Sequence, residues 1–164
     1  MNLSAKSPIC HWGSLIVTIL VIVGLGAFIG YSSGSGAQSE WYQGLQKSSL
    51  NPPGFVFGIV WPILYTLMAV AAWWTWRQEP SEAVDRAKGW FVAQLGLNYA
   101  WSYIFFSWEQ SALAFMWIIL TLIFVLIWVR ALSKLNDVMA LIQIPYIAWL
   151  CFASYLSASI VFLN

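Results

Sequence analysis

Three of the twelve tryptophans, Trp61, Trp101 and Trp149, lie well inside apolar segments of the chain. At about 1.5 Å of rise per helical residue, Trp61 lies roughly 9 Å below the expected start of its helix. An indole N–H in hydrocarbon needs a hydrogen-bond partner, so we expect these side chains to face a bundle interior or a ligand. Indole rings in such positions can stack on an aromatic ligand, and plain core packing is the alternative.

Neighbouring residues fall on the same helical faces as two of these tryptophans. Trp61 and Tyr65 are four positions apart, so they share one face of a helix. Tyr146, Trp149 and Ala153 follow the spacing i, i+3, i+7 and share a face of another helix. These two faces are candidate walls of a binding site.

A polar stripe marks the apolar segment that contains Trp101. Gln94, Asn98 and Ser102 recur every fourth residue, and Phe105 lies close to them. An uncharged polar stripe at membrane depth should turn away from lipid. We expect interhelical hydrogen bonds from Gln94 and Asn98, and ligand contact from Ser102.

Groups for conventional catalysis or metal binding are scarce. The only histidine is His11, and the two cysteines, Cys10 and Cys151, are isolated from each other. Such a set forms no metal site, disulfide framework or nucleophile–base pair. The apolar segments also lack internal Asp, Glu, Lys and Arg, which argues against an ion-coupled pump. We therefore expect no intrinsic cofactor and no metal.

The elements that must position these residues are membrane-spanning helices. Hydrophobic residues make up 61% of the 164-residue chain and charged residues 8%, against about 25% charged in a soluble domain. A spanning helix needs roughly 20 apolar residues. The pattern predicts an all-α membrane protein, a single-domain five-transmembrane-helix bundle, with spans at about 13–33, 55–76, 89–107, 111–130 and 138–162. The first span also resembles a signal peptide, although its length favours a retained helix.

Basic residues predict the orientation in the membrane. One side of a five-span arrangement holds Lys6, Arg77, Arg86, Lys88, Arg130 and Lys134, and the other holds Lys47. The positive-inside rule then places the N-terminus in the cytoplasm, and the C-terminus and loop 34–54 on the opposite side. The net charge of +1 gives no reason to expect nucleic acid as a partner. Interfacial belts account for most other tryptophans, including Trp128.

The long connection 34–54 predicts a functional loop. Trp41 and Tyr42 could fold over the outer mouth of the bundle as a lid, or rest on the lipid headgroups. Pro52 and Pro53 stiffen the end of this loop before the next helix.

Three motifs carry a resemblance to a known family. They are Trp41-Tyr42-x-x-Leu45-x-Lys47 with Asn51-Pro52-Pro53-Gly54 and Trp61-x-x-Leu64-Tyr65, then Leu97-Asn98-Tyr99-Ala100-Trp101-Ser102-x-x-Phe105-Phe106, and finally Ile144-Pro145-Tyr146-Ile147-Ala148-Trp149-x-x-Phe152-Ala153-Ser154-Tyr155-Leu156. In order and spacing, the chain resembles the translocator protein / tryptophan-rich sensory protein family. It departs from the family pattern at Ser48, where proline is usual, and at Ser157, where asparagine is usual.

The resemblance implies a compact five-helix bundle, often dimeric, with a pocket under the first loop. Family ligands are porphyrins such as protoporphyrin IX and haem, sterols in some members, and benzodiazepine-type compounds. Some bacterial members are reported to degrade protoporphyrin in light, and the two implicated pocket tryptophans correspond to Trp61 and Trp149. The rest of the family pocket corresponds to Tyr42, Tyr65, Trp101, Ser102, Phe105 and Ala153.

Three functions remain open at this point. The first is binding of porphyrins or related hydrophobic molecules in tetrapyrrole handling, transport or stress sensing, with Tyr146 as a further contact. The second is light-dependent porphyrin degradation by the pocket tryptophans, and the third is a transporter of porphyrin or sterol. The lipid bilayer, in a bacterial membrane, and a second copy of the chain are the expected partners. Small-xxx-small patterns such as Gly26/Gly30, Gly89/Ala93 and Gly96/Ala100 suit a homodimer or packing within one chain.

Overall fold

The computed structural model describes residues 8–35 and 39–164, with side chains from Trp12 onward. The predictions for Lys6, and for the side chains of Cys10 and His11, lie outside the described residues. The described chain is helical and contains no strand. Its elements are α1 (Pro8–Ser32), α2 (Glu40–Gly44), α3 (Gly54–Trp76), α4 (Glu82–Ser102), the π-helical turn η1 (Tyr103–Ser107), α5 (Ser111–Ser133), α6 (Asp137–Leu141) and α7 (Ile144–Leu163).

Four helical stretches in the described residues are long and apolar enough to cross a membrane. They are Trp12–Ser32, Gly54–Trp76, Ser111–Ser133 and Asp137–Leu163. Large apolar side chains cover their outer faces, as at Leu20 and Met116, which are 66% and 61% exposed. Lipid is the solvent that suits such a surface, so the chain is an integral membrane protein.

Four of the five predicted spans are therefore confirmed in length and composition. The remaining one, 89–107, corresponds to α4 and η1, and α4 is less apolar than the others. Its first turns carry charged residues, and Gln94 and Asn98 interrupt its apolar sequence.

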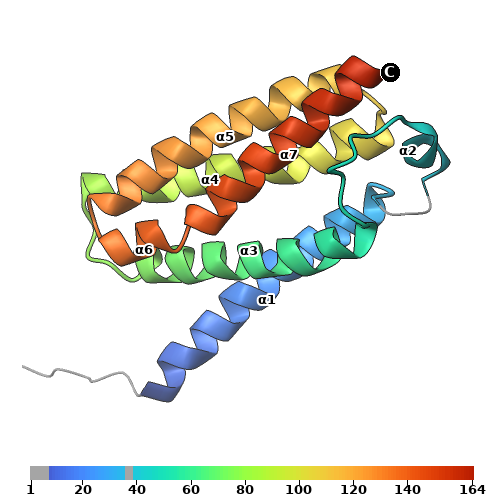
Figure 1. The fold of residues 1–164 in the computed structure, drawn as a ribbon. Coiled ribbons are helices and arrows are strands. Elements are labelled where there is room, and N and C mark those ends of the chain that lie inside the picture. Colours follow the sequence, from blue (N-terminus) through green and yellow to red (C-terminus); the bar gives the residue numbers. More distant parts are fainter. Residues whose placement is uncertain (1–7, 36–38) are drawn as a thin grey trace, which may run out of the picture.

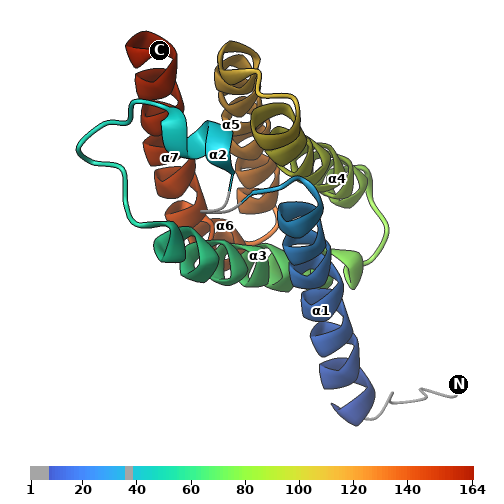
Figure 2. The same ribbon diagram turned by 90° about the vertical axis from the view of Figure 1, so that its right-hand side faces the viewer.

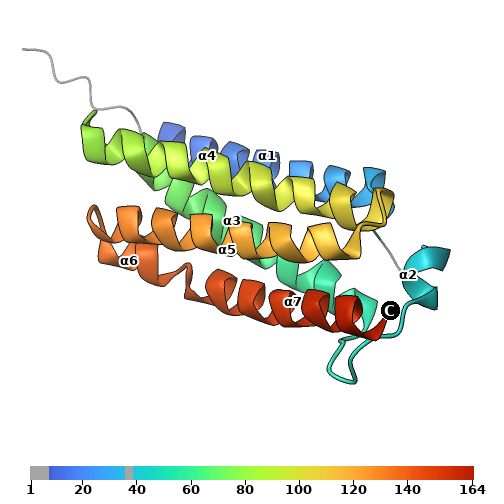
Figure 3. The same cartoon turned by 90° about the horizontal axis from the view of Figure 1, so that it is seen from above.

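The helices form two layers (Figures 1 and 3). In one layer α5 packs between α4 and α7, and in the other α1 packs against α3. The N-terminal half of α1 diverges from the bundle, as Figures 1 and 2 show, and Trp12 there is 65% exposed. The short helix α2 and the C-terminus lie together at the opposite end (Figure 1). The lid segment, residues 39–53, thus lies over one end of the bundle.

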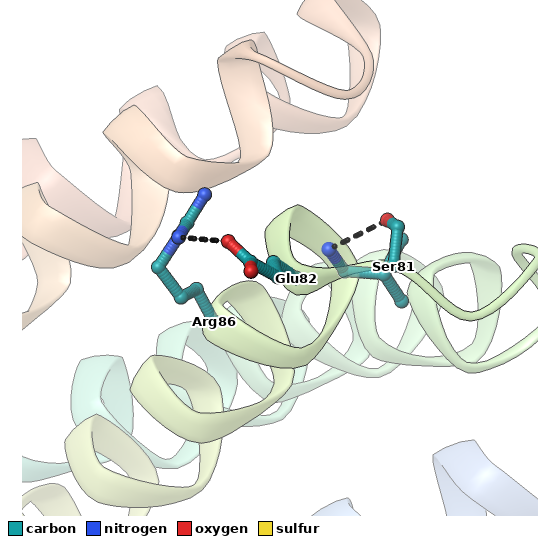
Figure 4. Close-up of polar contacts among 4 residues, drawn as sticks. Ser81, Glu82 and Arg86 are labelled. Carbon is teal, nitrogen blue, oxygen red and sulfur yellow. Dashed lines mark hydrogen bonds and ion pairs between the residues drawn. The ribbon is translucent and has the colours of Figure 1, made fainter.

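The start of α4 differs from the prediction, since the helix begins at Glu82 rather than at 89. The Ser81 side chain accepts a hydrogen bond from the backbone N–H of Val84 at 3.3 Å (Figure 4). Glu82 lies in the first turn and pairs with Arg86 at 3.3 Å. A serine N-cap and an acidic first turn both stabilise a helix start. Polar residues therefore extend this helix beyond its apolar part.

The last predicted span, 138–162, is not one continuous helix. It is broken between α6 and α7, where Pro145 occupies the second position of α7. Proline cannot donate the backbone hydrogen bond that a helix interior needs, but it is tolerated in a first turn. The Gln143 side chain at the break donates to the carbonyl of Leu67 in α3 at 3.1 Å. The interruption is therefore anchored to a neighbouring helix.

The main core lies between the two layers and includes a tryptophan that we assigned to the interfacial belt. Trp128 is only 1% exposed, and its ring centroid lies 5.3 Å from that of Phe91. That assignment is wrong because the Trp128 face of α5 is turned toward α4 and not toward lipid.

Candidate functional site

A cavity of about 770 Å³ lies within the bundle below the lid segment. Small-molecule sites in proteins usually measure about 300–1,000 Å³. Eight of the nine residues predicted to contact a ligand line this cavity: Tyr42, Trp61, Tyr65, Trp101, Ser102, Phe105, Trp149 and Ala153. They come from α2, α3, α4, η1 and α7, so the fold brings together residues from distant parts of the sequence.

Nine of the residues that line the cavity are aromatic. Trp61 and Tyr65 stack with their centroids 5.4 Å apart, at an interplanar angle of 30°. Trp101 and Phe105 stack at 4.9 Å with an angle of 8°. The Trp101 Nε1–H donates to the carbonyl of Ala114 in α5 at 3.0 Å, which fixes the orientation of this ring. Fixed, mutually stacked rings offer flat apolar surfaces to a ligand.

Trp149 forms a wall between two spaces. It lines the cavity, and it also lines a groove of apolar side chains between α3 and α7, together with Val60, Ile63, Leu64, Pro145, Ala148 and Phe152. Its buried Nε1–H has no hydrogen-bond partner among the described residues. An unpaired buried donor is costly. A ligand acceptor in the cavity would remove this cost.

The floor of the cavity is a hydrogen-bonded network that joins three helices. The Tyr65 hydroxyl donates to Asn98 Oδ1 at 2.8 Å, and Asn98 Nδ2 donates to the Tyr146 hydroxyl at 3.1 Å. The Tyr146 hydroxyl donates in turn to Gln94 Oε1 at 3.0 Å. The interhelical bonding that we expected of Gln94 and Asn98 is therefore present. Tyr146 is fully buried beneath the floor and is not among the residues that line the cavity.

The lid packs on the outer aromatic residues of the cavity. Ser39 caps α2 by accepting from the N–H of Tyr42 at 3.2 Å. Trp41 meets Phe105 edge-on, with centroids 5.3 Å apart, and Tyr42 meets Phe106 at 5.7 Å. Trp41 supports the lid from outside the cavity, whereas Tyr42 and Pro52 line it. Pro53 lies at the N-cap of α3 and connects the lid to that helix.

The hydroxyl group of Tyr42 also braces the lid segment internally, because it donates to Asn51 Oδ1 at 3.4 Å. Burial raises the pKa of this hydroxyl above its ordinary value, and the bond to Asn51 acts in the opposite direction. The group therefore stays protonated at neutral pH and remains a donor.

Side-chain contacts attach the lid to the end of α7. Asn164 Oδ1 accepts from the N–H of Gln46 at 2.9 Å, and Asn164 Nδ2 donates to the carbonyl of Gln46 at 3.0 Å. The hydroxyls of Ser48 and Tyr155 share a hydrogen bond of 2.9 Å. The lid is thus closed by contacts far apart in the sequence.

The π-helical turn η1 shapes the outer half of the cavity. Such turns insert an extra residue into a helix and are frequent at functional sites. Here the turn contains Phe105 and Phe106, which both line the cavity. Ser107 Oγ donates to the carbonyl of Ser33, which fixes the turn against α1.

Several lining residues were not predicted as site residues, notably Gly26, Lys47, Asn98, Thr121 and Ser157. Gly26 was noted only as part of a small-residue pattern, and Lys47 only for its charge and as part of the loop motif. Ser157 is 2% exposed, and its buried hydroxyl has no partner among the described residues. The motif around Lys47 and the departure from the family pattern at Ser157 were signals that could have indicated these positions.

Known proteins resemble this chain over most of its length. Residues 16–163 match the TspO/MBR family. The chain is 31% identical to the tryptophan-rich protein TspO of Archaeoglobus fulgidus, covering 92% of this chain and 96% of that protein. It is 33% identical to the human translocator protein, over 81% of this chain and 80% of that protein. It is 32% identical to the tryptophan-rich sensory protein of Cereibacter sphaeroides, over 76% of this chain and 77% of that protein. Family motifs, helical membrane architecture and similarity over most of the chain agree: the chain belongs to the TspO/MBR family.

Proposed function

We propose that the cavity binds a porphyrin, such as protoporphyrin IX or haem, or a related large hydrophobic molecule. The observation that carries this proposal is the aromatic wall of a cavity of about 770 Å³, with Trp61, Tyr65 and Trp149 on it. A porphyrin is a broad, flat π-system, and aromatic side chains stack favourably on such surfaces. The family resemblance, and relatives named as translocator and sensory proteins, support a role in tetrapyrrole handling, transport or sensing.

Titration with protoporphyrin IX, followed by quenching of tryptophan fluorescence, tests this proposal. We expect saturable binding by the wild type and much weaker binding after Trp61→Phe combined with Trp149→Phe. The matched control is Trp12→Phe combined with Trp108→Phe, because these indoles are 65% and 60% exposed, away from the cavity. Equal affinity in both double variants would reject stacking on Trp61 and Trp149.

Light-dependent oxidative degradation of the bound porphyrin, with dioxygen as the oxidant, is the second candidate. It is favoured by the presence of two indoles, those of Trp61 and Trp149, on the wall of one cavity. Illumination of the aerobic complex should then yield a product that the Trp61→Phe variant does not form. Binding without any photoproduct would leave only the first function.

We also propose that α4 crosses the membrane, giving five spans with the N-terminus in the cytoplasm. Its 21 residues reach about 32 Å, close to the roughly 30 Å of a bilayer core, and it packs along α5. Single cysteines at Ser49 and Glu79, in a Cys10→Ser, Cys151→Ser background, test this arrangement in intact cells. A membrane-impermeant maleimide should label the cysteine at position 49 and not the one at position 79.

A further inference from the structure

Lys47 places a fixed positive charge at the mouth of the cavity. Its side chain lines the cavity, in the lid segment just after α2. Nζ donates to the carbonyl oxygens of Gln43 and Leu45 at 3.3 and 3.0 Å. The same Nζ lies 4.5 Å from the centroid of the Tyr42 ring, in cation–π geometry. Three contacts within its own loop therefore hold this ammonium group in place.

No aspartate or glutamate of the described residues neutralises this charge within 4.0 Å. The ion pairs of Arg86 with Glu82 and of Lys88 with Asp85 are both at the start of α4. That end of the bundle is opposite the lid (Figure 1). Lys47 is also the single charged residue among those that line the cavity, where the other groups are aromatic, aliphatic or uncharged polar. A single lysine charge thus lines a cavity whose other lining groups are uncharged.

An ammonium group has three N–H donors, and the two carbonyl contacts leave one available. A carboxylate forms a stronger hydrogen bond with such a donor than a neutral acceptor does. The partly buried position of Lys47 reduces the screening by water that weakens ion pairs at an open surface.

We propose that Lys47 forms a carboxylate-binding subsite, which selects planar hydrophobic ligands that carry an acidic side group. The ring system then lies against the aromatic wall, and the carboxylate points toward the mouth. This inference rests on the proposed function, because it assumes that the ligand occupies the cavity. It adds the orientation of the ligand and the class of substituent that is recognised.

Protoporphyrin IX and its dimethyl ester form a matched pair of probes, since the ester has the same ring system without the two carboxylates. The full-length protein is measured in bilayers of phosphatidylcholine alone, so that no anionic lipid headgroup can bind Lys47 in place of the ligand carboxylate. Lys47→Gln should weaken binding of protoporphyrin IX about tenfold, the usual size of a hydrogen bond to a charged group, and leave ester binding unchanged. Lys47→Arg should restore most of the affinity, and added salt should reduce the difference between wild type and Lys47→Gln.

The control variant is Lys134→Gln, which removes a lysine after α5 at the far end of the bundle. It should bind both probes as the wild type does. Equal loss of both probes in Lys47→Gln would overturn the inference, because the lysine would then act only by shaping the lid. Unchanged binding of both probes would also overturn it and leave the proposed function standing, whereas absence of binding of either probe to the wild type would reject the proposed function itself.

Discussion

The ring of Tyr65 packs directly on the backbone of Gly26, where α1 crosses α3. A Cβ atom added at Gly26 would overlap this ring, with Tyr65 Cδ2 only 2.8 Å away. The ring cannot easily retreat, because its hydroxyl is bonded to Asn98. Both residues line the cavity, so this contact sets the width of the cavity at that level.

Gly26→Ala should therefore impair ligand binding. Overpacking in a closed contact costs about 1–3 kcal/mol, and a displaced Tyr65 ring would enter the ligand space, so we expect at least about tenfold weaker binding. Gly24→Ala is the matched control in the same helix, because a Cβ there meets nothing within 4 Å. Titration of both variants with protoporphyrin IX measures the effect, and equal affinities would contradict it.

The network beneath the cavity should be important for stability. Asn98→Leu leaves the buried hydroxyl of Tyr65 without its acceptor and removes the donor to Tyr146, whose own bond to Gln94 remains. Each unsatisfied buried group costs about 1–3 kcal/mol, so the midpoint of thermal unfolding in detergent should fall by several degrees. Thr66→Val serves as the control, since the Thr66 hydroxyl bonds only within its own helix and the residue is partly exposed. A midpoint equal to that of the control would argue against the network.

The contact between Asn164 and Gln46 should control the rate of ligand exchange. Asn164→Ala removes two hydrogen bonds that hold the lid on α7, each worth about 0.5–1.5 kcal/mol. Stopped-flow measurement should show severalfold faster dissociation of the ligand with little change in the unfolding midpoint. Ser159→Ala deletes a hydroxyl that bonds only to Tyr155 of the same helix, and it should dissociate at the wild-type rate. Equal rates in the two variants would show that lid opening does not limit release.

Replacing either of two serines on α7 by alanine should affect the stability of the unliganded protein differently. Ser157 Oγ is buried and has no hydrogen-bond partner in the part of the chain that the structure describes, whereas Ser154 Oγ donates to the carbonyl of Leu150 at 2.7 Å. Ser157→Ala removes an unsatisfied polar group and should raise the unfolding midpoint, while Ser154→Ala should not. Calorimetry of the two variants provides the comparison, and a lower midpoint for Ser157→Ala would contradict the prediction.

Periodicity was enough to predict the parts of the site that depend on one helix at a time. The four-residue spacing of Gln94 and Asn98 placed both inside the bundle, where they form their network. Trp128 was misassigned because a tryptophan near the basic end of a helix can lie either at the membrane interface or in the protein core. Its packing against Phe91, which places it in the core, cannot be predicted from the sequence of α5 alone. Pro145 predicts a bend in the last span, but the full break before α7 was not predicted, because its anchor, Leu67, is far away in the sequence.

Contacts of the lid were the least predictable part of the site. Gln46 and Asn164 are paired only because the loop returns across the end of α7. No local pattern encodes that return. The position of Lys47 beside the cavity depends on the same path of the loop. The distribution of basic residues could therefore predict the side of the membrane on which Lys47 lies, but not the residues that it contacts.

The network of Tyr65, Asn98, Tyr146 and Gln94 consists only of phenol and amide groups. Such groups keep the same charge from mildly acidic to mildly alkaline conditions. Mild acidification on either side of the bilayer therefore does not change the charge of the groups that form the floor of the cavity. Any pH dependence of ligand binding should then come from the ligand or from the lid, and not from this network.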